Sequence, residues 1–197
     1  MKRTPQAGLA LAAFLGFACM AEAHTHIYQA TLTGPNEATP NASPGSGTST
    51  VTLDLDLITM QVEIAFPGLA GLSTAAAIHG PTALPFTGTA GAMSPALSAS
   101  GFPLGVTLGT YDYTFDLTDA PGYDPAFITS SGGTVSNALN ALIFSFADGK
   151  SYLDIQSSAF PGGEIRGFFT EVPEPVSGAL IAIAGSSLAV RRRPWAR

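Results

Sequence analysis

Apolar and polar residues alternate along several stretches of this chain, and this period of two is typical of strands that bury one face. The clearest stretch is 48–57, where one valine and three leucines occupy one face and threonines and aspartates occupy the other. A similar stretch at 60–66 follows after only Ile58-Thr59, a link short enough to predict a β-hairpin. Further strands are predicted at 27–32, 111–117, 152–156 and 164–169.

A different period marks the segment 135–147, where five apolar residues recur at positions i, i+4, i+7, i+8 and i+11, the spacing of a helix. Thr134 or Ser136 is a suitable N-cap, and Gly149 is a suitable end. Residues 82–109 are rich in Gly, Ala, Pro and Thr and are expected to form long loops. The whole pattern predicts a mainly β fold, an antiparallel β-sandwich or Greek-key barrel with one short helix.

The first 23 residues have the organisation of a secretory signal peptide. Lys2 and Arg3 precede an apolar segment at 7–20, and Ala21-Glu22-Ala23 offers a small-x-small cleavage site. We expect cleavage after Ala23. The only cysteine, Cys19, is then removed, so the mature protein forms no disulfide and has no thiol nucleophile.

The last segment, 172–197, contains three consecutive parts: a proline motif, an apolar run at 176–190 and a group of arginines. The motif consists of Val172, Pro173, Glu174 and Pro175, and the arginines are Arg191, Arg192 and Arg193. The run of 15 residues is shorter than the roughly 20 that a bilayer core needs, but snorkelling of flanking side chains and local thinning can compensate. We expect a C-terminal transmembrane segment whose arginines stay on the cytoplasmic side.

This tail resembles the PEP-CTERM sorting signal of Gram-negative bacteria. The resemblance implies an exosortase-like membrane protease that recognises the Pro-Glu-Pro region and releases the protein or transfers it outward. It also implies a precursor in the inner membrane and a product at the cell surface or outside the cell. Proteins with such tails are associated with extracellular polysaccharide and biofilm, so extracellular polysaccharide is a candidate partner. The membrane is then contacted only through the tail.

Between these two segments lies a single domain, residues 24–171, with an acidic composition. It contains twelve acidic side chains and only two basic ones, Lys150 and Arg166, so its net charge is −10. This charge repels a phosphate backbone, so we expect no nucleic-acid partner. A low content of charged residues with many small and hydroxyl-bearing ones suits a soluble extracellular domain.

Three blocks occur in a fixed order along this domain. The first spans 28–37 and continues at 47–51, the second spans 68–81, and the third spans 147–167. The most specific part is the run Pro161, Gly162, Gly163, Glu164, Ile165, Arg166 and Gly167. Together the blocks resemble the CHRD domain, a family first described in chordin and common in secreted bacterial proteins, and the resemblance covers nearly the whole domain.

The histidines of that family are mostly replaced in this chain. The family usually has His-Ile-His-Gly in the second block and another histidine in the third, where this chain has Ala77, His79 and Gln156. Asp154 also replaces a common asparagine. Three converging histidines could hold a metal, whereas a single one cannot, so we expect no cofactor.

The remaining signature residues are interpreted as structural. We expect His79 to lie at a strand end and to bond to the backbone of a turn. Glu164 and Arg166 project from the same face of a strand, which predicts an ion pair that holds the last strand in place. Gly162 and Gly163 are expected to allow a turn or bulge.

Two further sets of side chains offer weaker hypotheses. Asp112, Asp116, Asp119 and Asp124 could bind calcium, but their spacing fits no EF-hand loop and a solvated face is the favoured interpretation. Cleavage after Ala23 would expose His24-Thr25-His26, whose amine, amides and imidazole suit Cu(II) or Ni(II). This metal hypothesis stays outside the main prediction.

No catalytic motif accompanies these residues: the sequence has no Gly-x-Ser-x-Gly elbow, P-loop, dinucleotide fingerprint or HExxH. We therefore expect a non-enzymatic, exported protein with a structural or adhesive role in the cell envelope or extracellular matrix. One alternative is a metal-binding or superoxide-dismutase-like domain. Another is a carbohydrate-binding module that uses Tyr111, Tyr113 or Tyr123, although the alternation turns the first two inward.

Overall fold

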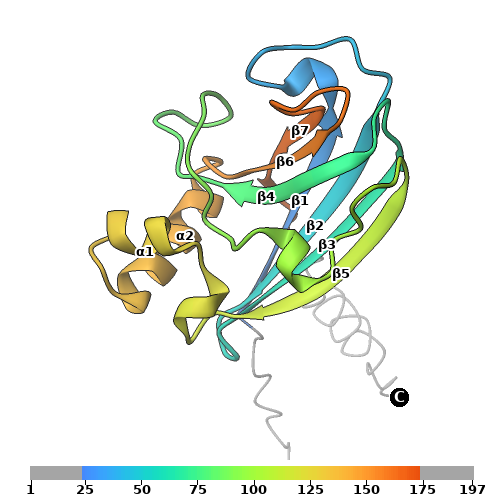
Figure 1. The fold of residues 1–197 in the computed structure, drawn as a ribbon. Helices are drawn as coiled ribbons and strands as arrows, with labels where there is room; N and C mark the ends of the chain where they lie inside the picture. Colours follow the sequence, from blue (N-terminus) through green and yellow to red (C-terminus); the bar gives the residue numbers. More distant parts are fainter. Residues whose placement is uncertain (1–23, 174–197) are drawn as a thin grey trace, which may run out of the picture.

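The computed structural model describes residues 24–173, which form one antiparallel sheet and two α-helices (Figure 1). The sheet has the strand order β4-β6-β7-β1-β2-β3-β5, and the short β8 also pairs with β1. It curls into a half-barrel, and α1 and α2 lie together at one side of it (Figure 1). The predicted mainly β, antiparallel fold is confirmed. The predicted number of helices, one, is wrong, because the described chain contains a second and shorter α-helix.

The predicted strands are all found within a few residues of their expected bounds. The strands are β1 (Thr25–Thr33), β2 (Ser46–Asp54), β3 (Thr59–Gly68), β4 (Ser73–His79), β5 (Gly109–Asp116), β6 (Tyr152–Ser157), β7 (Ile165–Phe168) and β8 (Thr170–Glu171). The helices are α1 (Pro125–Ser130) and α2 (Val135–Ala147), with 3-10 turns η1 (Gly34–Asn36), η2 (Leu97–Ser100) and η3 (Ala120–Gly122). The predicted long loops at 82–109 contain η2, isolated β-bridges and, at Gly109, the first residue of β5.

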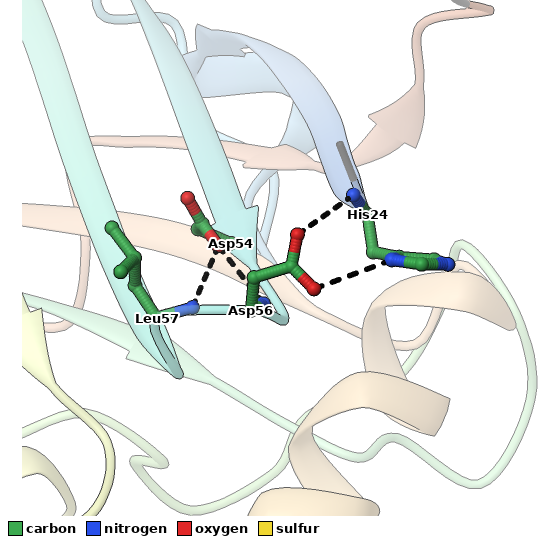
Figure 2. Close-up of polar contacts among 4 residues, drawn as sticks. All are labelled: His24, Asp54, Asp56 and Leu57. Carbon is green, nitrogen blue, oxygen red and sulfur yellow. Dashed lines mark hydrogen bonds and ion pairs between the residues drawn. The ribbon is translucent and has the colours of Figure 1, made fainter. Parts of the chain in front are cut away.

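The turn between β2 and β3 corrects one prediction. The alternation extends the strand to Leu57, but β2 ends at Asp54 and Leu57 is 69% exposed. The cause is a side-chain turn: the Asp54 carboxylate accepts hydrogen bonds from the backbone N–H groups of Asp56 (2.9 Å) and Leu57 (2.8 Å), as Figure 2 shows. Aspartate favours such turns because its carboxylate accepts hydrogen bonds from backbone N–H groups that follow it closely in the chain.

Helix α2 matches the predicted segment and closes the core of the half-barrel. Thr134 is its N-cap and accepts a hydrogen bond from the Asn137 backbone N–H at 3.2 Å. Leu142 and Phe146 are buried, and the Phe146 ring lies 5.1 Å from Tyr28 of β1. The missed helix α1 has six residues, too few for a periodic pattern, and is capped by Asp124.

The hydrophobic core lies entirely between residues 28 and 169, so the described part of the chain contains its own core. Within residues 24–173, no helix is long and apolar enough to cross a membrane. The signal peptide predicted at 1–23 and the transmembrane segment predicted at 176–190 lie outside the described residues.

Candidate functional site

A buried group of polar side chains lies on the outer face of the sheet, the face turned away from the hydrophobic core. On this face β6 and β7 place Asp154 opposite Arg166, and β4 places His79 two positions along. The loop after β1 adds Glu37. We call Glu37, His79, Asp154 and Arg166 the polar cluster. Glu37, Asp154 and Arg166 are only 7%, 8% and 2% exposed, so solvent barely reaches them.

Arg166 is held by aromatic rings rather than by the predicted partner. Its guanidinium lies 3.6 Å above the Tyr152 ring and 4.8 Å from the Phe168 ring, and it donates a hydrogen bond to the Gly88 carbonyl. The predicted ion pair between Arg166 and Glu164 is wrong, since the ion pairs of the described residues do not include it. Stacking on aromatic faces stabilises the buried guanidinium, although its Nε has no hydrogen-bond partner.

Glu164 instead ties three backbone segments together. Its carboxylate accepts hydrogen bonds from the Ser43 hydroxyl (2.6 Å) and from the backbone N–H groups of Ala70 (2.5 Å) and Gly71 (3.3 Å). Burial would raise the pKa of this carboxyl, but these bonds and one from Ser157 outweigh it and lower the pKa. The side chain is fully buried, so it acts as an internal cross-link of the last strand.

Glu37 and Asp154 form a carboxyl pair that sequence reasoning did not reveal. Burial, and then the neighbouring charge and hydrogen bond of Asp154, raise the pKa of Glu37 to about 8. Burial also raises the pKa of Asp154, although His79, Glu37, Gln156 and Arg166 act against it. Two carboxyl groups in one buried site cannot both ionise easily, so the raised pKa of Glu37 favours its protonated form at neutral pH. Glu37 comes from a loop without periodicity, and no motif marks it.

His79 lies at the end of β4 and contacts the backbone as predicted. Its Nδ1 lies 3.2 Å from the Ala90 carbonyl oxygen, so Nδ1 carries the proton and donates it. The imidazole stacks on the Tyr152 ring with a centroid distance of 5.0 Å and an angle of 8°. Burial lowers the pKa of His79, and the nearby Asp154 only partly offsets this. The histidine is therefore mostly neutral at pH 7.

The three positions that hold histidines in the resembled family converge on this outer face. Ala77 pairs with Asp154, and Gln156 pairs with Ala75 on the neighbouring strand, two residues before Ala77. His79 follows on the same face of β4. Only one imidazole remains, and no group of three potential metal ligands occurs in the described part of the chain. The polar cluster can hold a proton, but it contains no hydroxyl or thiol nucleophile.

The glycines of the signature have different roles. Gly163 has φ +125°, and a Cβ atom there would lie 2.6 Å from a carboxylate oxygen of Glu37. Gly167 allows the close approach of β1, because a Cβ atom would lie 2.4 Å from the Thr31 carbonyl oxygen. Gly162 and Pro161 lie in the exposed turn before β7, and a Cβ atom on Gly162 would meet open space.

The weaker candidate residues have ordinary local contacts. The His24 ring and backbone N–H contact Asp56 at 3.3 and 3.4 Å (Figure 2), and the His26 ring lies 2.8 Å from Glu171. The Cu(II) or Ni(II) hypothesis for His24 and His26 stays untested, and binding there would require His26 to leave Glu171.

The aspartates proposed as a calcium site are dispersed. Asp112 accepts a hydrogen bond from Gln61, Asp116 binds Thr118 and Asp124 caps α1, while Asp119 is exposed. Hydrogen bonds from Thr118 lower the pKa of Asp116. These contacts fit the favoured interpretation of a solvated face.

Of the tyrosines considered for carbohydrate binding, Tyr111 and Tyr123 are buried. The Tyr123 hydroxyl donates to the Leu117 carbonyl at 2.9 Å, so this side chain is structural. Tyr113 lies on the inner face of β5 with Tyr111 and Phe115, as predicted, but it is 42% exposed because β5 is the edge strand. Edge strands have one uncovered side, which leaves such rings partly open to solvent.

Residues 28–169 match the model of the CHRD domain, which agrees with the resemblance found in the three sequence blocks. No curated protein and no solved structure shows significant similarity to the chain.

Proposed function

Because this chain belongs to the CHRD domain family, we propose that it is an exported, non-enzymatic protein with a structural or adhesive role in the cell envelope or extracellular matrix. The observation that supports a structural role most directly is the burial of the polar cluster. Its titratable side chains lie beneath two loops, where they stabilise the fold and cannot reach a substrate. A general acid or base must come within hydrogen-bond distance of its substrate.

The two ends of the described chain lie side by side, which fits attachment of the domain to the membrane through the C-terminal tail alone. Strand β8 pairs with the beginning of β1, and the His26 ring lies 2.8 Å from Glu171. The Val172 backbone N–H also donates to the Ile27 carbonyl at 2.8 Å. The Pro-Glu-Pro motif therefore begins directly after Val172, which is hydrogen-bonded to β1. In our proposal the exosortase-like protease acts here, and the arginines keep the far end of the tail in the cytoplasm.

Export and sorting are tested by replacing Pro173, Glu174 and Pro175 together with alanine. Prolines keep this segment extended, the form in which a protease can bind it, so we expect a full-length precursor that stays in the membrane. Host cells are fractionated, and the protein is detected with an antibody to the domain and weighed by intact-mass spectrometry. The native chain should be released at a mass that begins at His24 and lacks the tail.

The matched control replaces Arg191, Arg192 and Arg193 with alanine. This change leaves the protease motif intact, so it should loosen membrane retention without preventing processing. If the alanine variant of the Pro-Glu-Pro motif still reaches the medium at its processed mass, the sorting proposal is wrong.

A further inference from the structure

An open trough crosses the outer face of the sheet beside the polar cluster. It consists of three adjoining hollows of about 710, 860 and 330 Å³. Thr48 of β2 lines all three, Thr31 joins the first to the second, and Ala65 and Thr110 join the first to the third. We propose that this trough binds a linear, uncharged polysaccharide chain. The inference deepens the proposed adhesive role by assigning its ligand class and its site.

The shape of the trough follows from the strand register. Thr31, Thr48, Ala65 and Thr110 lie opposite one another on β1, β2, β3 and β5. Phe168 extends this row, because the pairs Thr33–Arg166 and Gln29–Thr170 place it beside Thr31. The row therefore crosses four strand spacings, or roughly 19 Å at about 4.8 Å each. Its small middle side chains leave the hollow, which is long enough for several linked sugar rings.

Aromatic rings form one end of the trough. Phe86 is 56% exposed and meets Phe168 edge to face at a centroid distance of 6.3 Å. A sugar ring has an apolar C–H face that packs on such rings, while its hydroxyls need hydrogen-bonding partners. Those partners lie along the floor, where the neighbouring row supplies Gln29 and Thr50.

The charges of the trough select among polysaccharides. Glu63 and Asp112 are the only charged residues that line the three hollows, and they lie directly opposite each other on β3 and β5. Both basic side chains of the domain are engaged elsewhere: Lys150 bonds to Asp148, and Arg166 is buried. Uronic-acid and sulfated chains are therefore repelled, and so is a second copy of this acidic domain.

The test uses the full-length chain, purified in mild detergent so that the result does not depend on sorting. Isothermal titration calorimetry compares uncharged hexasaccharides of β-1,4-glucose, β-1,3-glucose and β-1,4-N-acetylglucosamine with hexasaccharides of alginate and hyaluronan. We expect saturable binding to at least one uncharged chain and none to the acidic chains. Binding to none of the uncharged chains, or to acidic chains only, with or without calcium, would overturn the inference.

Two variants locate the site. Thr48→Phe fills the point shared by all three hollows, and Phe86→Ala removes the exposed ring; each should weaken binding at least about tenfold. Thr114→Phe is the matched control, since Thr114 is exposed on the same face of β5 but lines none of these hollows. Equal affinity for Thr48→Phe and the native chain would refute the trough as the site. Because sorting is measured separately, failure here leaves the export proposal standing.

Discussion

At the scale of single residues, the polar cluster shows how burial changes the chemistry of ordinary side chains. Glu37, Asp154 and His79 would all be solvated and independent on a surface. Beneath the two loops their charged forms are disfavoured, and the carboxyl pair keeps a proton that free carboxyls lose near pH 4. The Arg166 guanidinium, in turn, packs on the faces of the Tyr152 and Phe168 rings.

The raised pKa of Glu37 predicts a pH dependence of stability. Between the unfolded value near 4.5 and the folded value of about 8, the folded protein binds more protons than the unfolded chain. Stability contributed by the protonated pair is therefore full below about pH 4.5 and is lost as the pH rises to about 8. Glu37→Gln should flatten this decline, because glutamine keeps the shape without the ionisation. Thermal unfolding at pH 5, 6.5 and 8 measures it.

Comparing Glu37→Gln with the native chain separates the effect of Glu37 on stability from the effect of His79. The lowered pKa of His79 makes stability rise with pH below about 6.5, and this effect is common to both proteins. Glu63→Gln is the control, because Glu63 is an exposed carboxylate on β3. If Glu37→Gln and the native chain lose stability in parallel from pH 5 to 8, the pKa of Glu37 is not raised in the folded protein.

Arg166 is predicted to be essential for stability although it forms no ion pair with Glu164. Arg166→Ala removes two ring contacts and leaves the Gly88 carbonyl and both buried carboxyls without their cation, which should cost about 3 kcal/mol. The measurement is urea unfolding of both proteins. Lys150→Ala, which breaks only a partly exposed pair with Asp148, should cost less than about 1 kcal/mol. Equal losses for the two variants would contradict this assignment.

At the scale of elements, the turn before β7 decides how the last strand joins the sheet. The alternation of apolar and polar residues predicts β7 itself, but Gly162 and Gly163 in the preceding turn look equivalent in the sequence. Only Gly163 has a positive φ and faces the Glu37 carboxylate. Positions of this kind are set by the segment that packs against them, which here lies more than one hundred residues away in the chain.

The two glycines provide a matched pair of substitutions. Gly163→Ala should destabilise the domain by at least about 2 kcal/mol, because alanine is strained at this φ and its Cβ meets Glu37. Gly162→Ala should be close to neutral, since its Cβ would enter open space. Urea unfolding of both variants checks this. A neutral Gly163→Ala would show that the loop carrying Glu37 is not packed against this turn.

At the scale of the whole molecule, the half-barrel separates a closed structural region from an open surface. The polar cluster lies under loops at the β4–β6–β7 end of the sheet, while the trough runs across β1, β2, β3 and β5 and ends at Phe168 of β7. The two ends of the described domain meet where β8 pairs with β1, beside the hollow that Gln29 and Thr170 line.

The alternative of a metal-dependent domain makes a different prediction for the whole molecule. A structural or catalytic metal would add its binding free energy to folding, so a chelator would lower the melting temperature. We expect EDTA to leave the melting temperature unchanged, because a single imidazole remains where the resembled family has three histidines. Metal analysis after dialysis accompanies the melting curves. Stoichiometric zinc or copper that depends on His79 would favour the alternative.

The sequence by itself determined six of the eight strands of the described chain, helix α2, the acidic charge and the family, while β4 and β8 were not predicted. These features follow from local periodicity and contiguous motifs, which can be recognised without knowing the distant contacts of the chain. The loop positions of Leu55 to Leu57 were missed because the Asp54 side chain competes with strand pairing at short range.

Only the tertiary structure decided which side chains meet. Glu164 bonds to Ser43, which lies 121 residues away, and Arg166 faces aromatic rings instead of Glu164. Glu37 joins Asp154 through a loop that carries no pattern, and the trough exists because four strands align small residues in one row. Partners of this kind depend on strand register and loop packing, and these are properties of the folded chain that no single stretch of sequence contains.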